Sequence, residues 1–231
     1  MIVCDTFVFL HLHKSGGTYV NQMLMTCVPS ARRIGYHLPY NQIPESLRTL
    51  PVVGTVRNPW AYYVSWYHFQ QGQERPNPLF LICSDGGTAD FATTIRNLVT
   101  LESNPERIRQ LSDAFPESFV NYGLNLTRSC IARISGSGLG FYSFLHDRLY
   151  AGAAAPLVLR TETLRQSLAE APLGLGASET IRMHRFLKAT PDLNTSRHDA
   201  YPSYYTPETR ALVAEMDGSV IAAYGYCFGD A

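Results

Sequence analysis

The chain lacks the features that mark several common classes of protein. Lys+Arg and Asp+Glu both number 19 in 231 residues, so the formal net charge is zero. Proteins that bind nucleic acid usually carry a basic surface, so no nucleic-acid partner is expected. No apolar run approaches the roughly 20 residues that a membrane-spanning helix needs. The sequence therefore predicts no membrane span.

Cysteine is sparse and irregularly placed. The five cysteines lie at positions 4, 27, 83, 130 and 227, with no pair in CxxC spacing. Neither they nor the histidines form a cluster with metal-ligand spacing, so no metal is expected. The odd number favours reduced thiols in a cytoplasmic, bacterial-like protein. A lumenal domain of a longer protein is the alternative that the sequence leaves open, and no pattern indicates an oligomeric state.

The composition fits one α/β domain. Hydrophobic residues make up 45% of the chain and charged residues 16%, as in an ordinary globular protein with a substantial core. Neither internal repeats nor low-complexity linkers divide the sequence, so we expect a single domain over residues 1–231.

The strongest local signal is the stretch FVFLHLHKSGGTYVNQMLM at residues 7–25. The apolar run over 2–12 predicts a buried strand, and a helix is predicted from about Thr18. Between them, Gly16 and Gly17 let backbone N–H groups come close to a ligand. A tight turn between an ordinary strand and helix is the alternative interpretation.

The polar residues of this turn favour an anion as the ligand. Lys14 adds a positive charge, Ser15 and Thr18 add hydroxyl donors, and a helix N-terminus follows. The turn is not a Walker A loop, in which the lysine follows the glycines. We therefore predict a phosphate or sulfate site. An ATP-dependent, P-loop-like phosphotransferase has less support because no acidic motif suits Mg²⁺.

A second strand–helix unit, PVVGTVRNPWAYYVSWYHF, repeats this pattern. Its β-branched run predicts a strand over Val52–Val56, and Pro59 suits the first turn of a helix whose aromatic residues are expected mainly in the core. Arg57 follows the strand, and Ser65 lies about two turns into the helix. Ligands bind at the carboxyl ends of strands in open α/β sheets, so both side chains are predicted to hold a second phosphate. The alternatives are a structural cap at Arg57 and a surface role for Ser65.

The remainder of the chain predicts further helices and one more strand. The strand is expected over 156–160, and a loop is expected over 76–88. Helices are expected over 90–101, 106–112, 118–134, 141–152, 162–170 and 178–186, and from Pro207 onward.

Taken together, the two motifs resemble a known family. HLHKSGGT followed by VVGTVRNPWAYYVSWYHF is similar to the paired 5′- and 3′-phosphate motifs of sulfotransferases that use PAPS (3′-phosphoadenosine 5′-phosphosulfate). The similarity is to the carbohydrate type, such as heparan sulfate 2-O- and 6-O-sulfotransferases and their bacterial relatives. It implies a P-loop-like sulfotransferase fold, in which helices flank a central, mostly parallel sheet. It also implies transfer of the sulfuryl group to a hydroxyl acceptor, a carbohydrate or small metabolite, with PAP (3′-phosphoadenosine 5′-phosphate) as the product.

The resemblance also assigns roles in nucleotide binding. Lys14 would contact the 5′-phosphosulfate bridge. The four residues after Lys14 would hold the 5′-phosphate: Ser15, Gly16, Gly17 and Thr18. The 3′-phosphate would be held by the second motif: Arg57 and Ser65. Two residues of the C-terminal loop would close over the nucleotide: Ser196 and Arg197.

Sulfuryl transfer to a hydroxyl requires a group that takes the hydroxyl proton. Histidine suits this task near neutral pH, and His37 in GYHLPY matches the place of the family's catalytic histidine. We therefore expect His37 to be the general base and Lys14 to assist the leaving phosphate. His11 and His13, which would face one side of the strand, are rival candidates for the base. They are otherwise expected to line the acceptor site, and a purely structural role is the alternative for His11.

Other residues and functions remain open. Glu162 could be an acceptor-site carboxylate, or simply an acid at a helix N-terminus, and His198 is a further candidate base. Besides the phosphotransferase, the alternative is a non-catalytic protein that keeps the fold and binds a nucleotide.

Overall fold

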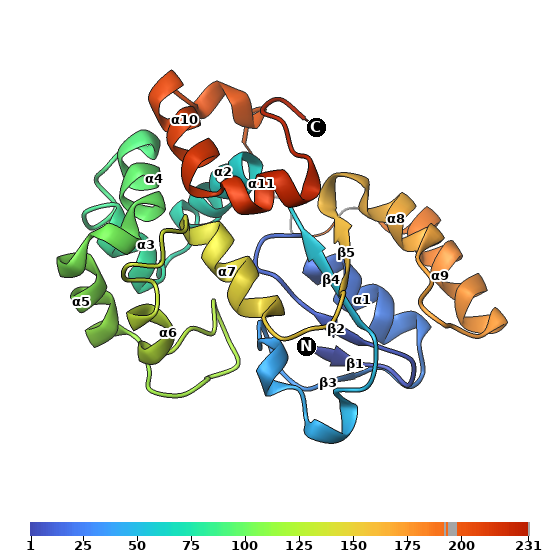
Figure 1. Ribbon diagram of the computed structural model, residues 1–231. Coiled ribbons are helices and arrows are strands. Elements are labelled where there is room, and N and C mark those ends of the chain that lie inside the picture. The colour runs from blue at the N-terminus through green and yellow to red at the C-terminus, as the bar shows by residue number, and fades with distance from the viewer. Residues whose placement is uncertain (192, 194–197, 231) are drawn as a thin grey trace. The chain divides into compact units, whose positions relative to one another are not determined.

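The computed structural model describes residues 1–191, 193 and 198–230. Within it the chain divides into two compact units. The first consists of Met1–Arg57 and Arg148–Thr195, and the second of Asn58–Asp147 and Ser196–Ala231. The strands of the described residues all belong to the first unit, whereas the second unit is helical (Figure 1). That the whole chain is one domain stays a prediction.

The first unit is built on a mixed sheet with a parallel centre. Its strands are β1 (Ile2–Val3), β2 (Val8–Leu10), β3 (Arg32–Arg33), β4 (Val52–Val56) and β5 (Leu157–Arg160). They lie in the order β3-β1-β2-β4-β5. The pairs β2–β4 and β4–β5 are parallel, while β1 pairs antiparallel with both β2 and β3. The predicted α/β class with a central sheet is confirmed.

The single strand predicted over 2–12 is wrong, because the chain reverses within it. Asp5 and Thr6 are exposed and form a bend, and the Cys4 N–H donates to the Phe7 carbonyl over 2.9 Å. Asp and Thr are common in turns because their side chains bond locally to the backbone. The apolar run therefore forms a hairpin, in which Val3 pairs with Val8.

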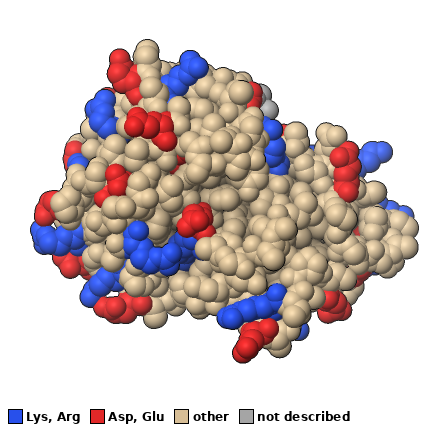
Figure 2. Space-filling view, in the orientation of Figure 1, with Lys and Arg blue, Asp and Glu red and all other residues tan. Residues whose placement is uncertain are grey.

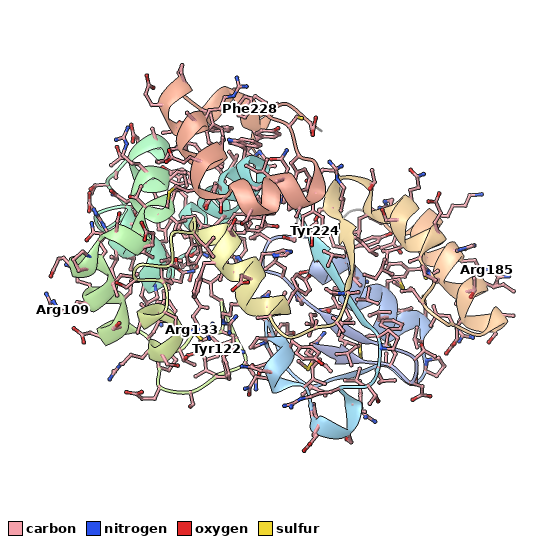
Figure 3. The ribbon with its side chains drawn as sticks, viewed as in Figure 1. Arg109, Tyr122, Arg133, Arg185, Tyr224 and Phe228 are labelled. Atoms are coloured by element: carbon pink, nitrogen blue, oxygen red, sulfur yellow. The ribbon has the colours of Figure 1, made fainter. Side chains whose placement is uncertain are left out.

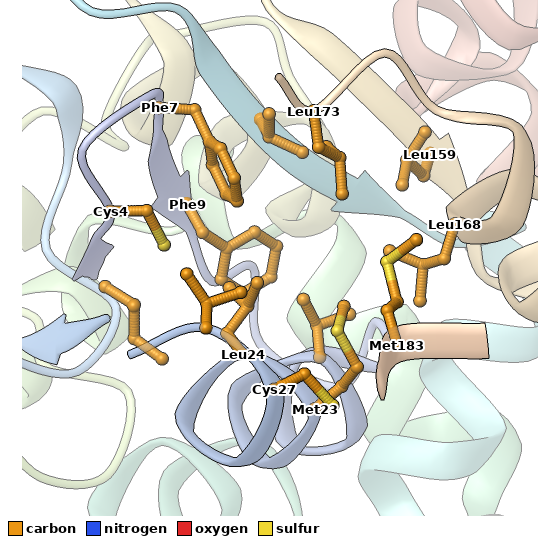
Figure 4. Packing of buried hydrophobic residues seen from close by; sticks show 14 of the residues in the cluster. Cys4, Phe7, Phe9, Met23, Leu24, Cys27, Leu159, Leu168, Leu173 and Met183 are labelled. Carbon is orange, nitrogen blue, oxygen red and sulfur yellow. The ribbon is translucent and has the colours of Figure 1, made fainter. Parts of the chain in front are cut away.

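Helices cover the sheet of the first unit and fix its core. They are α1 (Gly17–Cys27), α8 (Leu164–Glu170) and α9 (Ala177–Ala189), with 3₁₀ turns η1 (Tyr40–Gln42), η2 (Glu45–Leu47) and η4 (Thr161–Thr163). Phe9 of β2, Met23 of α1 and Met183 of α9 meet in one buried cluster (Figure 4). Burying a side chain of this size stabilises the fold by about 1.5–3 kcal/mol. This core holds α1 against the end of β2, where the first motif lies.

The second unit is helical, and its helix α2 packs against α4 and α10. Its helices are α2 (Pro59–Gln71), α3 (Pro78–Cys83), α4 (Phe91–Val99), α5 (Pro105–Ala114), α6 (Arg128–Ala132), α7 (Phe141–Tyr150), α10 (Pro207–Met216) and α11 (Gly218–Tyr224), with 3₁₀ turns η3 (Leu101–Ser103) and η5 (Tyr201–Tyr204). The last three residues of α7 belong to the first unit. Tyr62, Tyr63 and Trp66 of α2 are fully buried, as expected for core aromatic residues. None of the described helices is both long and apolar enough to span a membrane.

Two other predicted elements differ from the structure. Only α6 forms within the helix expected over 118–134, because Asn121, Gly123 and Asn125 have positive φ, which interrupts an α-helix. The loop expected over 76–88 contains α3 instead. The Asn77 side chain accepts a hydrogen bond from the Phe80 N–H over 2.8 Å and so caps that helix.

A buried carboxylate organises the second unit. Asp217, which is 0% exposed, accepts hydrogen bonds from the Tyr63 hydroxyl over 2.7 Å and the Ser143 N–H over 2.8 Å. The Tyr63 oxygen in turn accepts from the Tyr142 N–H over 3.1 Å. Two N–H groups in the first turn of α7 are thereby satisfied. Burial raises the pKa of Asp217 to about 6.

The face of the molecule shown in Figure 2 has no large patch of one charge. Basic and acidic side chains are interspersed there, in keeping with the zero net charge.

Candidate functional site

The carboxyl ends of three parallel strands meet at one edge of the sheet in the first unit. Segment 11–16 leaves β2 at this edge, Arg57 leaves β4 and Thr161 leaves β5. The Thr161 hydroxyl donates to the Val56 carbonyl over 2.8 Å and ties two of these ends together. This edge is where open α/β sheets bind their ligands.

Both glycines of the first motif are required by the protein's own packing. Gly16 has φ 74°, and a Cβ there would lie 2.7 Å from Leu164 Cδ2. A Cβ on Gly17 would lie 1.8 Å from His11 Cδ2. The absent side chain at Gly17 therefore leaves a notch in α1 that the His11 ring fills. The expected approach of a ligand to these glycines stays a prediction.

The loop presents a helix N-terminus together with two cations. The N-cap residue of α1 is Gly16, which has no side chain to accept hydrogen bonds from the first N–H groups of the helix. Lys14 has φ 53°, in the left-handed region, and Arg57 Nη1 donates to its main-chain oxygen over 3.2 Å. Burial, and then the Arg57 charge, lower the pKa of Lys14 to about 8. An anion bound here would offset the repulsion between the two charges.

Three histidines gather beside this loop. His37 Nδ1 lies 2.8 Å from the His11 carbonyl oxygen, and its ring centroid lies 4.3 Å from that of His11 and 5.3 Å from that of His13. Burial lowers the pKa of His37 to about 4 and the pKa values of His11 and His13 well below their usual range. All three rings are thus neutral near pH 7. His11 and His13 lie beyond the end of β2, in the loop.

Two buried polar residues in this cluster were not predicted. Asn21 Nδ2 lies 3.2 Å from His11 Nδ1, and Arg148 Nη1 donates to the His37 carbonyl over 3.4 Å. Asn21 could have been found, because it lies four residues after Gly17 and so shares its helix face. No sequence signal points to Arg148, which is 111 residues from its partner.

The remaining predicted site residues have varied positions. Ser15 is fully buried, and its hydroxyl donates to the His13 carbonyl over 3.2 Å, while Thr18 is exposed. Glu162 is half-buried and follows Thr161 in η4. Ser65 and His198 belong to the second unit, where Ser65 is buried on α2 and the His198 ring stacks on His68 at 5.5 Å. Ser196 and Arg197 lie outside the described residues.

Among the described residues, no group of three or more His, Cys, Asp or Glu side chains is arranged to hold a metal ion. The groups gathered at the sheet edge suit an anion and a proton transfer instead. They are a lysine, an arginine, a helix N-terminus and neutral histidines.

Comparison with known proteins supports the fold. No protein-family model matches the chain, and no curated protein matches its sequence. Among solved structures, the chain is similar to the mouse sulfotransferase SULT7A1, which was crystallised in complex with PAP. The similarity has a TM-score of 0.53 at 14% identity and covers 95% of this chain and 86% of that one. The chain therefore has a sulfotransferase fold.

Proposed function

We propose that this chain is a sulfotransferase that moves the sulfuryl group of PAPS to a hydroxyl acceptor. The observation that carries the proposal is the contact between Arg57 and Lys14 beside the N-terminus of α1. Two cations and a helix N-terminus at the ligand-binding edge of this fold suit a nucleotide with anionic groups at both 5′ and 3′ positions.

Each part of the nucleotide has a proposed partner. The Lys14 ammonium binds the phosphosulfate bridge, and the first N–H groups of α1 bind the 5′-phosphate. The Ser15 hydroxyl donates within the loop, so we assign its backbone N–H to this role. Arg57 uses one N–H for the Lys14 carbonyl. We assign the 3′-phosphate to its guanidinium, whose planar fork matches the oxygens of a phosphate.

The proposed reaction is an in-line displacement at sulfur. The acceptor oxygen forms a bond to sulfur, and the bond between sulfur and the 5′-phosphate oxygen breaks, with its electron pair staying on PAP. His37 Nε2 takes the hydroxyl proton. Lys14 and the helix N-terminus stabilise the charge that builds on the leaving phosphate. We assign the half-buried His13 and Glu162 to the acceptor side of this site, whereas the His11 ring is buried against α1.

The acceptor class that we propose is a carbohydrate or a small metabolite. Its support is the balance of charge on the chain, because a strongly anionic polymer is usually met by an extended basic surface.

The proposal is tested by measuring PAP release from PAPS with a panel of sugar and small hydroxyl acceptors, in the presence of EDTA. We expect turnover that Lys14→Ala reduces about 100-fold, the scale of losing one group that stabilises developing charge. The matched control is Arg185→Ala, because Arg185 is exposed on the outer side of α9 (Figure 3). Turnover only with ATP and Mg²⁺ would instead indicate a phosphotransferase. PAP binding without turnover would indicate a non-catalytic protein.

A further inference from the structure

Two residues on one face of α1, Gly17 and Asn21, hold the ring of His11. Its Cδ2 and Nε2 fill the notch at Gly17, and its Nδ1 lies 3.2 Å from Asn21 Nδ2 one helical turn later. The amide donates to the ring nitrogen in this orientation, so the proton of the neutral ring lies on Nε2. The residue is 6% exposed, so the ring has little room to turn.

Packing alone does not explain an asparagine at position 21. The residue is 6% exposed, and Asn21 Oδ1 accepts no hydrogen bond from any residue that the structure describes. A buried amide oxygen without a partner costs stability, on the order of 1–3 kcal/mol. An apolar side chain would avoid that cost, so the hydrogen bond to His11 is the interaction that accounts for Asn21.

The main chain of His11 in turn fixes the tautomer of His37. A carbonyl oxygen can only accept, so the 2.8 Å contact requires the His37 proton to lie on Nδ1. The other nitrogen, Nε2, then carries a lone pair, and no residue among those described bonds to it. His37 also has φ 46°, a conformation that persists only where its surroundings enforce it.

The His11 carbonyl is not held by the sheet, because β2 ends at Leu10. The anchored His11 side chain restricts the main-chain torsions that aim this carbonyl. The His11 ring also forms part of the surface on which the His37 ring packs, at 4.3 Å between centroids. Freeing the ring of His11 would loosen both contacts to His37.

We propose that Asn21 is a positioning residue that acts through His11 to keep His37 Nε2 as the proton-accepting nitrogen. The inference rests on the proposed function, in which His37 takes the acceptor proton. In water, neutral histidine weakly prefers the tautomer with its proton on Nε2. A well-populated Nδ1–H form at His37 would therefore report this arrangement directly.

The test is ¹⁵N NMR of the histidine rings in the wild-type protein and in Asn21→Ala at pH 7, with His37→Gln to assign the signal. We expect Nδ1–H at His37 in the wild type and a mixture of tautomers in Asn21→Ala. The kcat of Asn21→Ala should fall about tenfold. This is part of the 10²–10⁴-fold rate increase that a general base supplies, because the base is still present but less well oriented. The KM for PAPS should change less than about twofold, because Asn21 is not proposed to touch the nucleotide.

The matched control is Gln22→Ala, a neighbouring polar residue that is exposed on α1 and should change neither readout. If Asn21→Ala does not fold, Asn21→Ser replaces it, since serine keeps a polar group but is too short to reach His11 Nδ1. An Nε2–H tautomer in the wild type, or an unchanged His37 signal in the variant, overturns the proposal. A tautomer change without sulfuryl transfer in the wild type would leave the positioning role intact and contradict the proposed function instead.

Discussion

Arg57 donates a hydrogen bond from Nη1 to the main-chain oxygen of Lys14 over 3.2 Å. This contact joins the end of β4 to the loop after β2 and brings two positive charges to one place. The Arg57 charge contributes, after burial, to the lowered pKa of Lys14. An anion that binds both groups would remove this repulsion, so we expect PAP to stabilise the protein against unfolding.

The notch at Gly17 predicts a large effect of a single methyl group. In Gly17→Ala the new Cβ would lie 1.8 Å from His11 Cδ2, so the buried ring must move. We expect a loss of about 2 kcal/mol or more in the free energy of unfolding, measured in urea. Gly218→Ala is the control, because nothing lies within 4 Å of a Cβ there. It should not lower the value and should raise it by up to about 1 kcal/mol, because alanine favours a helix more than glycine does. Equal stability of the two variants would show that the ring is not confined.

Asp217 predicts how the stability of the fold depends on pH. Its pKa is raised by burial from 3.8 to about 6. The folded state therefore holds this proton more tightly than the unfolded state. The stabilisation is complete below about pH 4 and is lost as the pH rises through about 6, an effect of roughly 3 kcal/mol at 1.36 kcal/mol per pKa unit.

The Asp217 effect is measured as the difference in unfolding free energy between the wild type and Asp217→Asn from pH 4 to pH 8. The asparagine does not titrate, so this difference should change most between pH 4 and pH 6.5. A difference that is flat over this range would contradict a buried carboxylate with a raised pKa.

The pH dependence of turnover follows from Lys14 and His37. His37 must be neutral to accept a proton, so kcat/KM should fall only when the pH drops through about 4. Lys14 must be charged, so kcat/KM should also fall as the pH rises through about 8. A fall in kcat/KM on acidification through about pH 6.5 that is absent in His37→Gln would show that the base is exposed and has an ordinary pKa. An acid limb that persists in His37→Gln would assign the base to another residue.

Local signals in the sequence were sufficient to predict the strand and the helix of the second motif. The β-branched run predicted β4 at Val52–Val56, as observed. Pro59 opens α2, and the Asn58 side chain accepts from the Trp60 N–H over 3.0 Å to cap it. A strand and a capped helix depend on neighbours in the sequence, so their bounds can be read from it.

Contacts between distant residues could not be predicted in this way. The bend at 5–6 divides an apolar run that periodicity alone assigns to one strand. The notch that makes Gly17 necessary depends on where the His11 ring packs, and Arg148 reaches His37 only in the folded chain. The sequence indicated that a lysine-led turn and Arg57 belong to one site. It gave no sign that Arg57 binds the loop itself.

The most direct test is calorimetry of PAP and AMP binding to the wild type, Arg57→Ala and the control Arg185→Ala. We expect PAP to bind the wild type and Arg185→Ala alike and far more tightly than AMP does. Arg57→Ala should lose at least tenfold in affinity for PAP, about 1.4 kcal/mol, and little for AMP, because a charge-assisted bond to the 3′-phosphate is worth that much or more. Equal affinity of the wild type for PAP and AMP, or unchanged PAP binding in Arg57→Ala, would contradict a site in which Lys14 and Arg57 bind one doubly phosphorylated nucleotide.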